Sequence, residues 1–343
     1  MARGHTLVAY AVTRLALALP MLLILLTAVF VILRILPGDP ILALWGGRTP
    51  PPDVVARARA EMGLDQPVLV QYWTYLTDVF RGDLGTSIGE QYRGNPVWGE
   101  IAERLPATIE LSIGSMFVAS VVGIGTGMLA GAKRDSWVDV VIRLYGTIIW
   151  VIPIFWLGLI FQMIFAVWLG WFPANGRWSG TDFPPGVTGL YTVDSLLEGN
   201  LGHFGKAVAH LVLPCLTLGL VLSGFFAKTV RANMLQTVRA DYSDAARARG
   251  IPERQVVFRH AFRNALVPVV TVLGLQFAIL FAGAVLTERT FSIEGIGTLL
   301  LTSITSKDMT MIQGVVVVYA TIIVGVSLVI DVLGAMIDPR IRL

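Results

Sequence analysis

"DAARARGIPERQVVFRHAFRNALVP", at residues 244–268, is a polar and basic stretch in a chain that is otherwise apolar. The 343 residues are 55% hydrophobic and only 14% charged, and the mean hydropathy is +0.71. The stretch nevertheless carries five arginines, on both sides of a Gly-Ile-Pro sequence: Arg247, Arg249, Arg254, Arg259 and Arg263. A basic segment with a fixed turn, set between two long apolar runs, indicates a loop with a function of its own.

The residues around this turn predict a short helix, a tight stop and a second helix. Asp241 can cap the first helix, with Asp244 three residues later in capping-box spacing. Gly250 suits a left-handed helix stop, and Pro252 suits the first position of the following helix. We call residues 241–263 the helical hairpin.

The second helix of the hairpin is predicted to be two-faced. Its apolar face holds Val257, Phe258, Ala261 and Ala265, and its basic face holds Arg259, His260 and Arg263. An anchor for anionic lipid headgroups would account for the arginines alone. A surface that docks another protein would also account for the small residues of "AARARG" and for the fixed turn.

The rest of the chain has the composition of a multi-pass membrane protein. A membrane-spanning helix needs about 20 apolar residues, and six stretches qualify: 9–36, 107–131, 142–170, 210–230, 265–287 and 312–337. The apolar part of the first stretch is too long for a signal peptide and no small-residue cleavage site follows it, so we expect a retained span. The net charge of +3 is too small to indicate a nucleic-acid partner.

The basic residues are distributed unevenly between the loops. Both terminal segments and the loops 132–143 and 228–264 together carry 15 Lys and Arg. The alternate, longer segments carry 10, with 15 Asp and Glu: 37–106, 170–209 and 288–311. The positive-inside rule therefore predicts that both termini and the helical hairpin are cytoplasmic.

The outer segment 37–106 is predicted to contain helices of its own. The stretch 66–85 is amphipathic and rich in aromatic residues, namely Tyr72, Trp73, Tyr75 and Phe80. Such residues commonly lie at the membrane interface. The alternative is a docking platform for an external partner.

"DAARARG" resembles the EAA signature of ABC importer permeases, in which Glu-Ala-Ala is followed after three residues by Gly. The chain is similar to the dipeptide, oligopeptide and nickel branch, in the subunit type with a long external loop after its first span. Six further motifs occur in the family's order: "ILPGDP" (35–40), "MGLDQPVLVQYWTYL" (62–76), "GDLGTS" (82–87), "HLVLPCLTLGL" (210–220), "TERTFSIEGIGTLL" (287–300) and "IDPRIRL" (337–343). Asp244 replaces the usual Glu, and Glu294 replaces the Pro that usually precedes Gly295.

The resemblance implies an all-α integral membrane protein with six transmembrane helices, both termini cytoplasmic, and the type I ABC importer permease fold. Residues 1–36 would form the N-terminus and first span, 37–106 the external loop, and 107–343 a five-helix core that includes the coupling loop 228–264. The implied location is the prokaryotic cytoplasmic membrane.

The implied partners are a second, homologous permease, two cytoplasmic ATPases and an external solute-binding protein. The resemblance assigns contact with the ATPases to nine residues of the hairpin: Asp241, Asp244, Ala245, Ala246, Arg247, Gly250, Ile251, Pro252 and Arg254. We expect no cofactor on this chain, since it lacks the Gly-rich phosphate loop of ATPases, so ATP and Mg belong to the partners. "GIGTGMLAG" (123–131) is instead predicted to serve helix packing.

Two polar residues within predicted spans are candidates for the translocation pathway. Gln276 and, more weakly, Gln162 could line a water-filled path or bond a neighbouring helix. Glu288 lies near the outer end of a span and is expected to extend to the interface rather than bind substrate. Cys215 is expected to be a small buried hydrophobe, and the four scattered histidines predict no metal site.

Two other classes of membrane protein are alternatives. A secondary transporter would show several ionisable groups within its spans, whereas Asp331 is nearly alone. An intramembrane enzyme would need paired catalytic groups at bilayer depth, and the sequence suggests no such pair. The transported solute stays open among dipeptides, longer peptides, glutathione-like conjugates and nickel complexes, because selectivity in this family resides largely in the binding protein.

Overall fold

The computed structural model describes residues 2–35, 51–61 and 63–337, and these ranges are helical without a named strand. The "ILPGDP" and "IDPRIRL" motifs and the Asp331 side chain lie almost wholly outside the described residues. The elements are α1 (Ala2–Ile35), α3 (Pro52–Glu61), α4 (Val68–Arg81), α5 (Val97–Ala132), α6 (Trp137–Val151), α7 (Ile154–Phe161), η1 (Gln162–Trp168), α8 (Tyr191–Leu197), α9 (Leu201–Val238), α10 (Asp241–Ala248), α11 (Glu253–Gln255), η2 (Val256–Ala261), α12 (Phe262–Thr290), α13 (Ile296–Thr305) and α14 (Met309–Ile337).

Most of the predicted spans coincide with long helices. Among the described residues, four helices are long and apolar enough to cross a membrane, or five if one bent pair counts as a span: Val12–Ile32, Val97–Ala132, Leu201–Val238, Met309–Ile330 and the pair Trp137–Val151 with Ile154–Trp168. The remaining predicted span, 265–287, lies within α12, a helix of 29 residues. The count of six crossings therefore stays a prediction.

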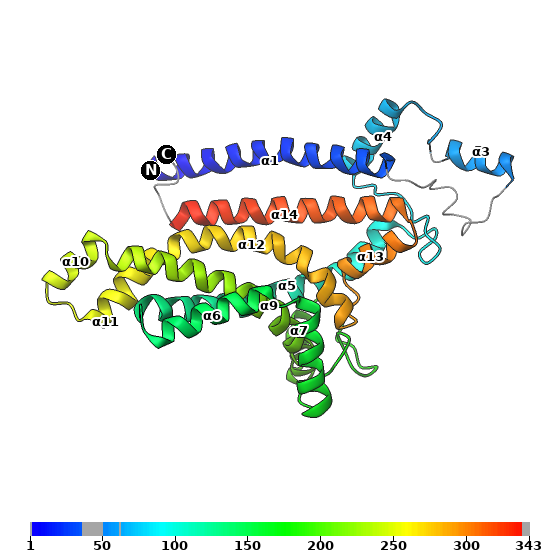
Figure 1. Ribbon diagram of the computed structural model, residues 1–343. Coiled ribbons are helices and arrows are strands. Elements are labelled where there is room, and N and C mark those ends of the chain that lie inside the picture. The colour runs from blue at the N-terminus through cyan, green and yellow to red at the C-terminus, as the bar shows by residue number, and fades with distance from the viewer. Residues whose placement is uncertain (1, 36–50, 62, 338–343) are drawn as a thin grey trace.

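The predicted span 142–170 is wrong as one continuous helix. It is divided into α6, α7 and the π-helix η1, and the two halves are bent by 102°. Pro153 causes the break, because a residue before proline is pushed out of the α region. Ile152 accordingly adopts an extended backbone, with φ −65° and ψ 127°. In Figure 1, α7 turns away from the direction of the other long helices.

Small residues allow α5 and α9 to pack closely. Gly123, Gly127 and Gly131 repeat every fourth residue on α5, and a Cβ at any of them would overlap atoms of α9. Close approach of this kind is the usual role of small residues at helix interfaces in membranes. The packing predicted for "GIGTGMLAG" is confirmed. Cys215, only 6% exposed, lies in the same core.

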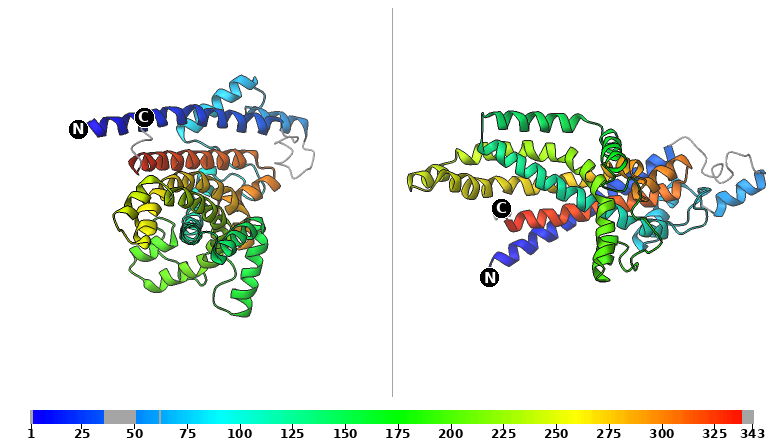
Figure 2. Two further views of the ribbon diagram at one scale, coloured as in Figure 1. Left: turned by 60° about the vertical axis from the view of Figure 1, so that its left-hand side comes forward. Right: turned by 90° about the horizontal axis from the view of Figure 1, so that it is seen from below.

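The long helices form successive layers with two distinct ends. α1 packs on α14, α14 on α12, and α12 on α9, as Figures 1 and 2 show. α10 and α11 lie at the same end as the start of α1 and the end of α14, whereas α3, α4 and α13 lie at the opposite end. The helical hairpin, the start of α1 and the end of α14 therefore share one end of the molecule, which agrees with the prediction that the hairpin and both termini lie on one side of a membrane.

Candidate functional site

The helical hairpin has the predicted form, with both of its helix starts shifted by one residue. Gly250 adopts φ 75°, so the left-handed stop is confirmed. Ala240, rather than Asp241, is the extended residue before α10, and no side chain caps that helix. Pro252 is likewise the residue before α11 and not its first member. The predicted capping box is wrong, and Asp241 and Asp244 instead occupy the first turn of α10.

Arg247 connects the two helices of the hairpin to each other and to the end of α9. Its guanidinium donates to both carboxylate oxygens of Glu253 at 2.8 and 2.9 Å and to Asp244 Oδ1 at 2.7 Å. It also donates to the carbonyl oxygen of Val238, at the end of α9. The Arg247 guanidinium lowers the pKa of the Glu253 carboxyl. In turn, the hydrogen bond with Glu253 and, to a smaller extent, the one with Asp244 raise the pKa of Arg247. A planar group with several donors suits this three-way contact better than an ammonium would.

The small residues of α10 divide between an inner and an outer face. Ala246 is only 7% exposed and Ser243 is fully buried, with its hydroxyl donating to the carbonyl oxygen of Thr237 at 2.8 Å. Ala245 and Asp244 are exposed. The helix therefore turns Ala246 toward the body of the chain, and the contact of the nine hairpin residues with the ATPases stays a prediction. Ile251 is half-buried, and Gly250, Pro252 and Arg254 are exposed beside Ala245.

The second half of the hairpin is joined to the long helices by apolar packing. Val257 and Ala265 lie in a buried cluster with Val230 and Met234 of α9. Phe258, predicted on the same face, is instead 39% exposed. The reason is that residues 256–261 form a π-helix, whose wider turn alters the spacing of side chains around the axis. The hairpin thus continues directly into α12.

A buried ion pair that the sequence did not reveal lies near the same end. Asp139 of α6 is fully buried, and Arg231 of α9 donates to its two carboxylate oxygens at 2.5 and 2.8 Å. The two residues are 92 positions apart, so no local pattern signals their pairing. The pair fixes the start of α6 against the half of α9 that leads to the hairpin.

The two candidate pathway residues have different surroundings. Gln162 donates through Nε2 to the carbonyl oxygens of Ala174 and Thr290 and to Asn175, at 2.9 to 3.1 Å. These bonds give it a structural role that joins η1 to the end of α12. Gln276 is 2% exposed, and its Oε1 has no hydrogen-bond partner among the described residues. The choice between pathway lining and helix packing stays open for Gln276.

Glu288, expected to extend to the interface, is fully buried and connects three helices. Its carboxylate accepts from the Thr108 hydroxyl of α5 at 2.6 Å and from the backbone N–H of Thr298 in α13 at 2.8 Å. A Cβ at Gly295 or Gly297 would overlap this carboxylate. The "TERTFSIEGIGTLL" motif therefore encodes a buried carboxylate together with the two glycines that make room for it.

A second buried carboxylate organises the loop that contains "GDLGTS". Asp308 precedes α14, and its carboxylate accepts from the Ser87 hydroxyl and from the backbone N–H groups of Ile88 and Met311. Gly82 ends α4 in the left-handed region, and Gly85 adopts φ 76°. Residues 82–88 are thereby held against the start of α14.

Segment 171–200 is folded around another buried carboxylate. Glu110 of α5 accepts from Arg177 at 2.6 Å and from both the backbone N–H and the hydroxyl of Thr192 at 2.7 Å. The Arg177 guanidinium also lies 4.0 Å from the centre of the Tyr191 ring. The sequence indicated no functional residue here, because the two partners lie 67 and 82 positions from Glu110 in a segment without clear periodicity.

Known proteins are similar in sequence to this chain over most of its length. The sequence profile described as "Binding-protein-dependent transport system inner membrane component" matches residues 123–343, and the N-terminal profile of the same system matches residues 7–112. The chain is 38% identical over 336 residues to a dipeptide transport system permease protein of Alkalihalophilus pseudofirmus, covering 98% of this chain and all of that protein. It is 40% identical over 330 residues to a di/tripeptide transport system permease protein of Pseudomonas aeruginosa, covering 96% of this chain and 97% of that protein. A probable D,D-dipeptide transport system permease protein of Escherichia coli is 42% identical over 313 residues, 91% of each chain.

Proposed function

Because the chain belongs to the family of binding-protein-dependent transport system inner membrane components, we propose that it is the permease subunit of an ATP-driven importer of di- or oligopeptides. The peptide assignment is supported by the names of the relatives, which describe permeases for dipeptides, di/tripeptides and D,D-dipeptides. Nickel complexes and glutathione-like conjugates are the alternative candidates for the transported solute.

In this proposal the chain forms half of a translocation pathway in the cytoplasmic membrane of a prokaryote. A homologous permease supplies the other half, and an external binding protein delivers the solute. The chain crosses the membrane six times with both termini inside, so the end that carries α10 and α11 is cytoplasmic. The position of the hairpin beside the start of α1 and the end of α14 supports its placement on the same side as both termini.

The helical hairpin is the surface on which one of two ATPases docks. It presents Ala245, Gly250, Pro252 and Arg254 to solvent at the tip of the molecule. Small exposed residues next to a rigid turn allow a partner's cleft to approach the backbone closely. ATP and Mg are bound by the ATPase chains, and this chain contributes no cofactor site.

The hairpin can transmit motion because it is rigidly joined to two spans. Arg247 connects α10 to α11 and to the end of α9, and Val257 and Ala265 pack against α9. A displacement of the hairpin by a nucleotide-driven ATPase would therefore move α9 and α12 with it. This continuity of packed contacts is the observation that best supports a coupling role.

The docking proposal is tested by copurification of the ATPases with permease variants in membranes. Ala245→Trp adds bulk to the exposed face, and Asp244→Lys reverses a charge beside it, so each variant should lose most of the ATPase. Ala56→Trp and Asp53→Lys on exposed positions of α3, at the opposite end, are matched controls that should retain it.

Insertion of each variant is checked by its amount in the membrane fraction. Full recovery of the ATPases with both Ala245→Trp and Asp244→Lys would refute docking at this surface. A lipid-anchor role predicts that Asp244→Lys strengthens binding to anionic vesicles, by about 1 kcal/mol for one added basic charge near the surface, with ATPase recovery unchanged.

A further inference from the structure

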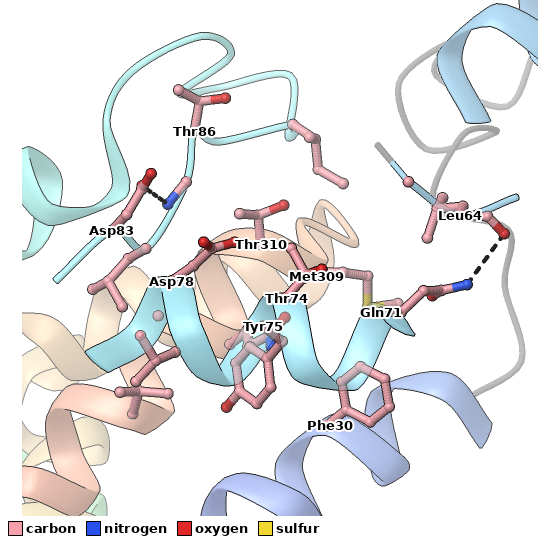
Figure 3. Close-up of a pocket in the computed structure, with 18 of the residues that line it drawn as sticks. Phe30, Leu64, Gln71, Thr74, Tyr75, Asp78, Asp83, Thr86, Met309 and Thr310 are labelled. Carbon is pink, nitrogen blue, oxygen red and sulfur yellow. Dashed lines mark hydrogen bonds between the residues drawn. The ribbon is translucent and has the colours of Figure 1, made fainter. Parts of the chain in front are cut away.

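A cavity of about 720 Å³ lies at the end of the molecule opposite the hairpin, where α4 packs beside α1 and α14 (Figure 3). Its volume is in the range of sites that hold small organic molecules. It is separate from the α5–α9 core and from the residues assigned to the coupling loop. Its walls come from segments distant in sequence, so a bound molecule would contact all of them.

One wall of the cavity is apolar and aromatic. The rings of Phe30 in α1 and Tyr75 in α4 stack with centres 5.6 Å apart, and Val79, Leu84 and Val317 line the cavity near them. Tyr72 anchors the same part of α4, since its hydroxyl lies 2.6 Å from the hydroxyl of Thr27. The aromatic residues expected at the membrane interface thus divide, with Trp73 and Phe80 exposed and the two tyrosines packed inward.

The other wall carries two carboxylates, placed there by the end of α4. Gly82 adopts the left-handed conformation, and the N–H of Asp83 bonds the carbonyl oxygen of Asp78 at 2.9 Å. This turn puts both Asp78 and Asp83 on the lining. In Figure 3, Asp78 points across the cavity toward Thr310 of α14, and Thr86 lies on the far side.

The electrostatics of this wall favour a cation. Two carboxylates lie at the negative end of the α4 dipole, and the described residues that line the cavity include no Lys, Arg or His. Arg81, in the last turn of α4, is exposed and does not belong to the lining. Asp83 uses Oδ1 to accept from the N–H of Gly85, and no ion pair of Asp78 or Asp83 occurs within the described part of the chain.

We propose that this cavity binds a small organic cation, with a primary ammonium on Asp78 and Asp83 and a short apolar body against Phe30 and Tyr75. Thr74, Thr310 and Gln313 offer further oxygens for the ammonium hydrogens. A bare metal ion would leave most of the volume empty, and the described residues include no cluster of three or more typical metal ligands. The ammonium could belong to a free amine or to the N-terminus of a peptide, and the inference does not depend on the transport function.

Titration calorimetry on the full-length chain in lipid nanodiscs tests the proposal. L-leucinamide carries an ammonium and an apolar body, and N-acetyl-L-leucinamide is the matched compound without the charge. We expect leucinamide to bind and the acetylated compound to bind at least roughly tenfold more weakly, since the charge-assisted hydrogen bonds are lost. Asp78→Asn and Asp83→Asn should each weaken leucinamide binding by about the same factor, because each removes one charge.

Asp65→Asn, on an exposed residue just before α4 that does not line the cavity, controls for the change in net charge and should bind as the unchanged protein does. Thr74→Leu narrows the cavity without altering its charge. It is the variant to use if an aspartate variant fails to insert, and it too should weaken binding.

The zwitterionic dipeptide Ala-Leu distinguishes the two possible sources of the ammonium, a free amine and a peptide N-terminus. Binding that depends on Asp78 assigns the site to peptide N-termini, and its absence assigns the site to free amines. No binding of leucinamide, equal binding of the acetylated compound, or binding unchanged by both aspartate variants would overturn the proposal.

Discussion

Gly295 and Gly297 have a role that depends on the absence of a side chain rather than on backbone freedom. Both lie beside the buried carboxylate of Glu288, which accepts hydrogen bonds from Thr108 and from the start of α13. A buried carboxylate is tolerated only when its oxygens are hydrogen-bonded. The two glycines let α13 approach closely enough for its N–H groups to do so.

Gly295→Ala should therefore destabilise the protein by about 1–3 kcal/mol, the usual cost of inserting a methyl group into a well-packed site. The added Cβ would overlap Glu288 and push α13 away from α12. Thermal unfolding of the purified protein in detergent measures the change.

Gly99→Ala is the matched control, since Gly99 is exposed on α5 and has no atom within 4 Å of an added Cβ. It should leave the midpoint unchanged or slightly raised, because alanine favours the helix. Equal midpoints for the two variants would contradict the role assigned to Gly295.

Helical elements in this chain are shaped as much by their interruptions as by their apolar periodicity. Pro153 divides α6 from α7, and the π-helix at 256–261 turns Phe258 outward. Within the hairpin, Gly250 makes the turn, while Arg247 holds the pieces on both sides of it. The rigidity of the hairpin, on which the proposed coupling relies, therefore depends on a side chain that contacts three elements.

Arg247→Ala should loosen the hairpin without unfolding the long helices. Amide hydrogen exchange at 239–252 is expected to become roughly tenfold faster. The variant lacks the hydrogen bonds to Val238, Asp244 and Glu253, so local opening of the hairpin costs less free energy. Mass spectrometry of peptides from this region measures the change.

Arg249→Ala removes a neighbouring arginine that is exposed on the same turn, and it should leave exchange at 239–252 unaltered. If the two variants exchange alike, Arg247 does not hold the hairpin together. Arg247→Lys should fall between them, since an ammonium cannot bond both oxygens of Glu253 while also reaching Val238.

At the scale of the whole molecule, the long helices separate two structurally distinct ends. One end carries the hairpin with the start of α1 and the end of α14, and the opposite end carries the folded segments that surround Glu110, Glu288 and Asp308. The three buried carboxylates each join segments that are distant in sequence. The end opposite the hairpin is thus held together by hydrogen bonds as well as by apolar packing.

Reporter fusions can assign these ends to sides of the membrane. Truncations fused after Gly89 and after Asn200 should give an external signal, and a fusion after Arg254 should give a cytoplasmic signal. The expectation follows from the basic residues of the loops. An external signal at Arg254 would invert the orientation and remove the hairpin from the reach of ATPases.

The sequence by itself determined the family, the positions of the long helices and the turn at Gly250, but not the contacts between distant segments. Apolar periodicity, turn residues and the order of motifs are local, so they can be read within a few neighbouring residues. The inward orientation of Ala246, the burial of Glu288, the Arg231–Asp139 pair and the hydrogen bonds of Gln162 were decided only by tertiary structure. The Arg231–Asp139 pair joins residues 92 positions apart, and the Glu288–Thr108 hydrogen bond joins residues 180 positions apart. A buried polar group finds such a partner only after the helices are rotated and packed against one another.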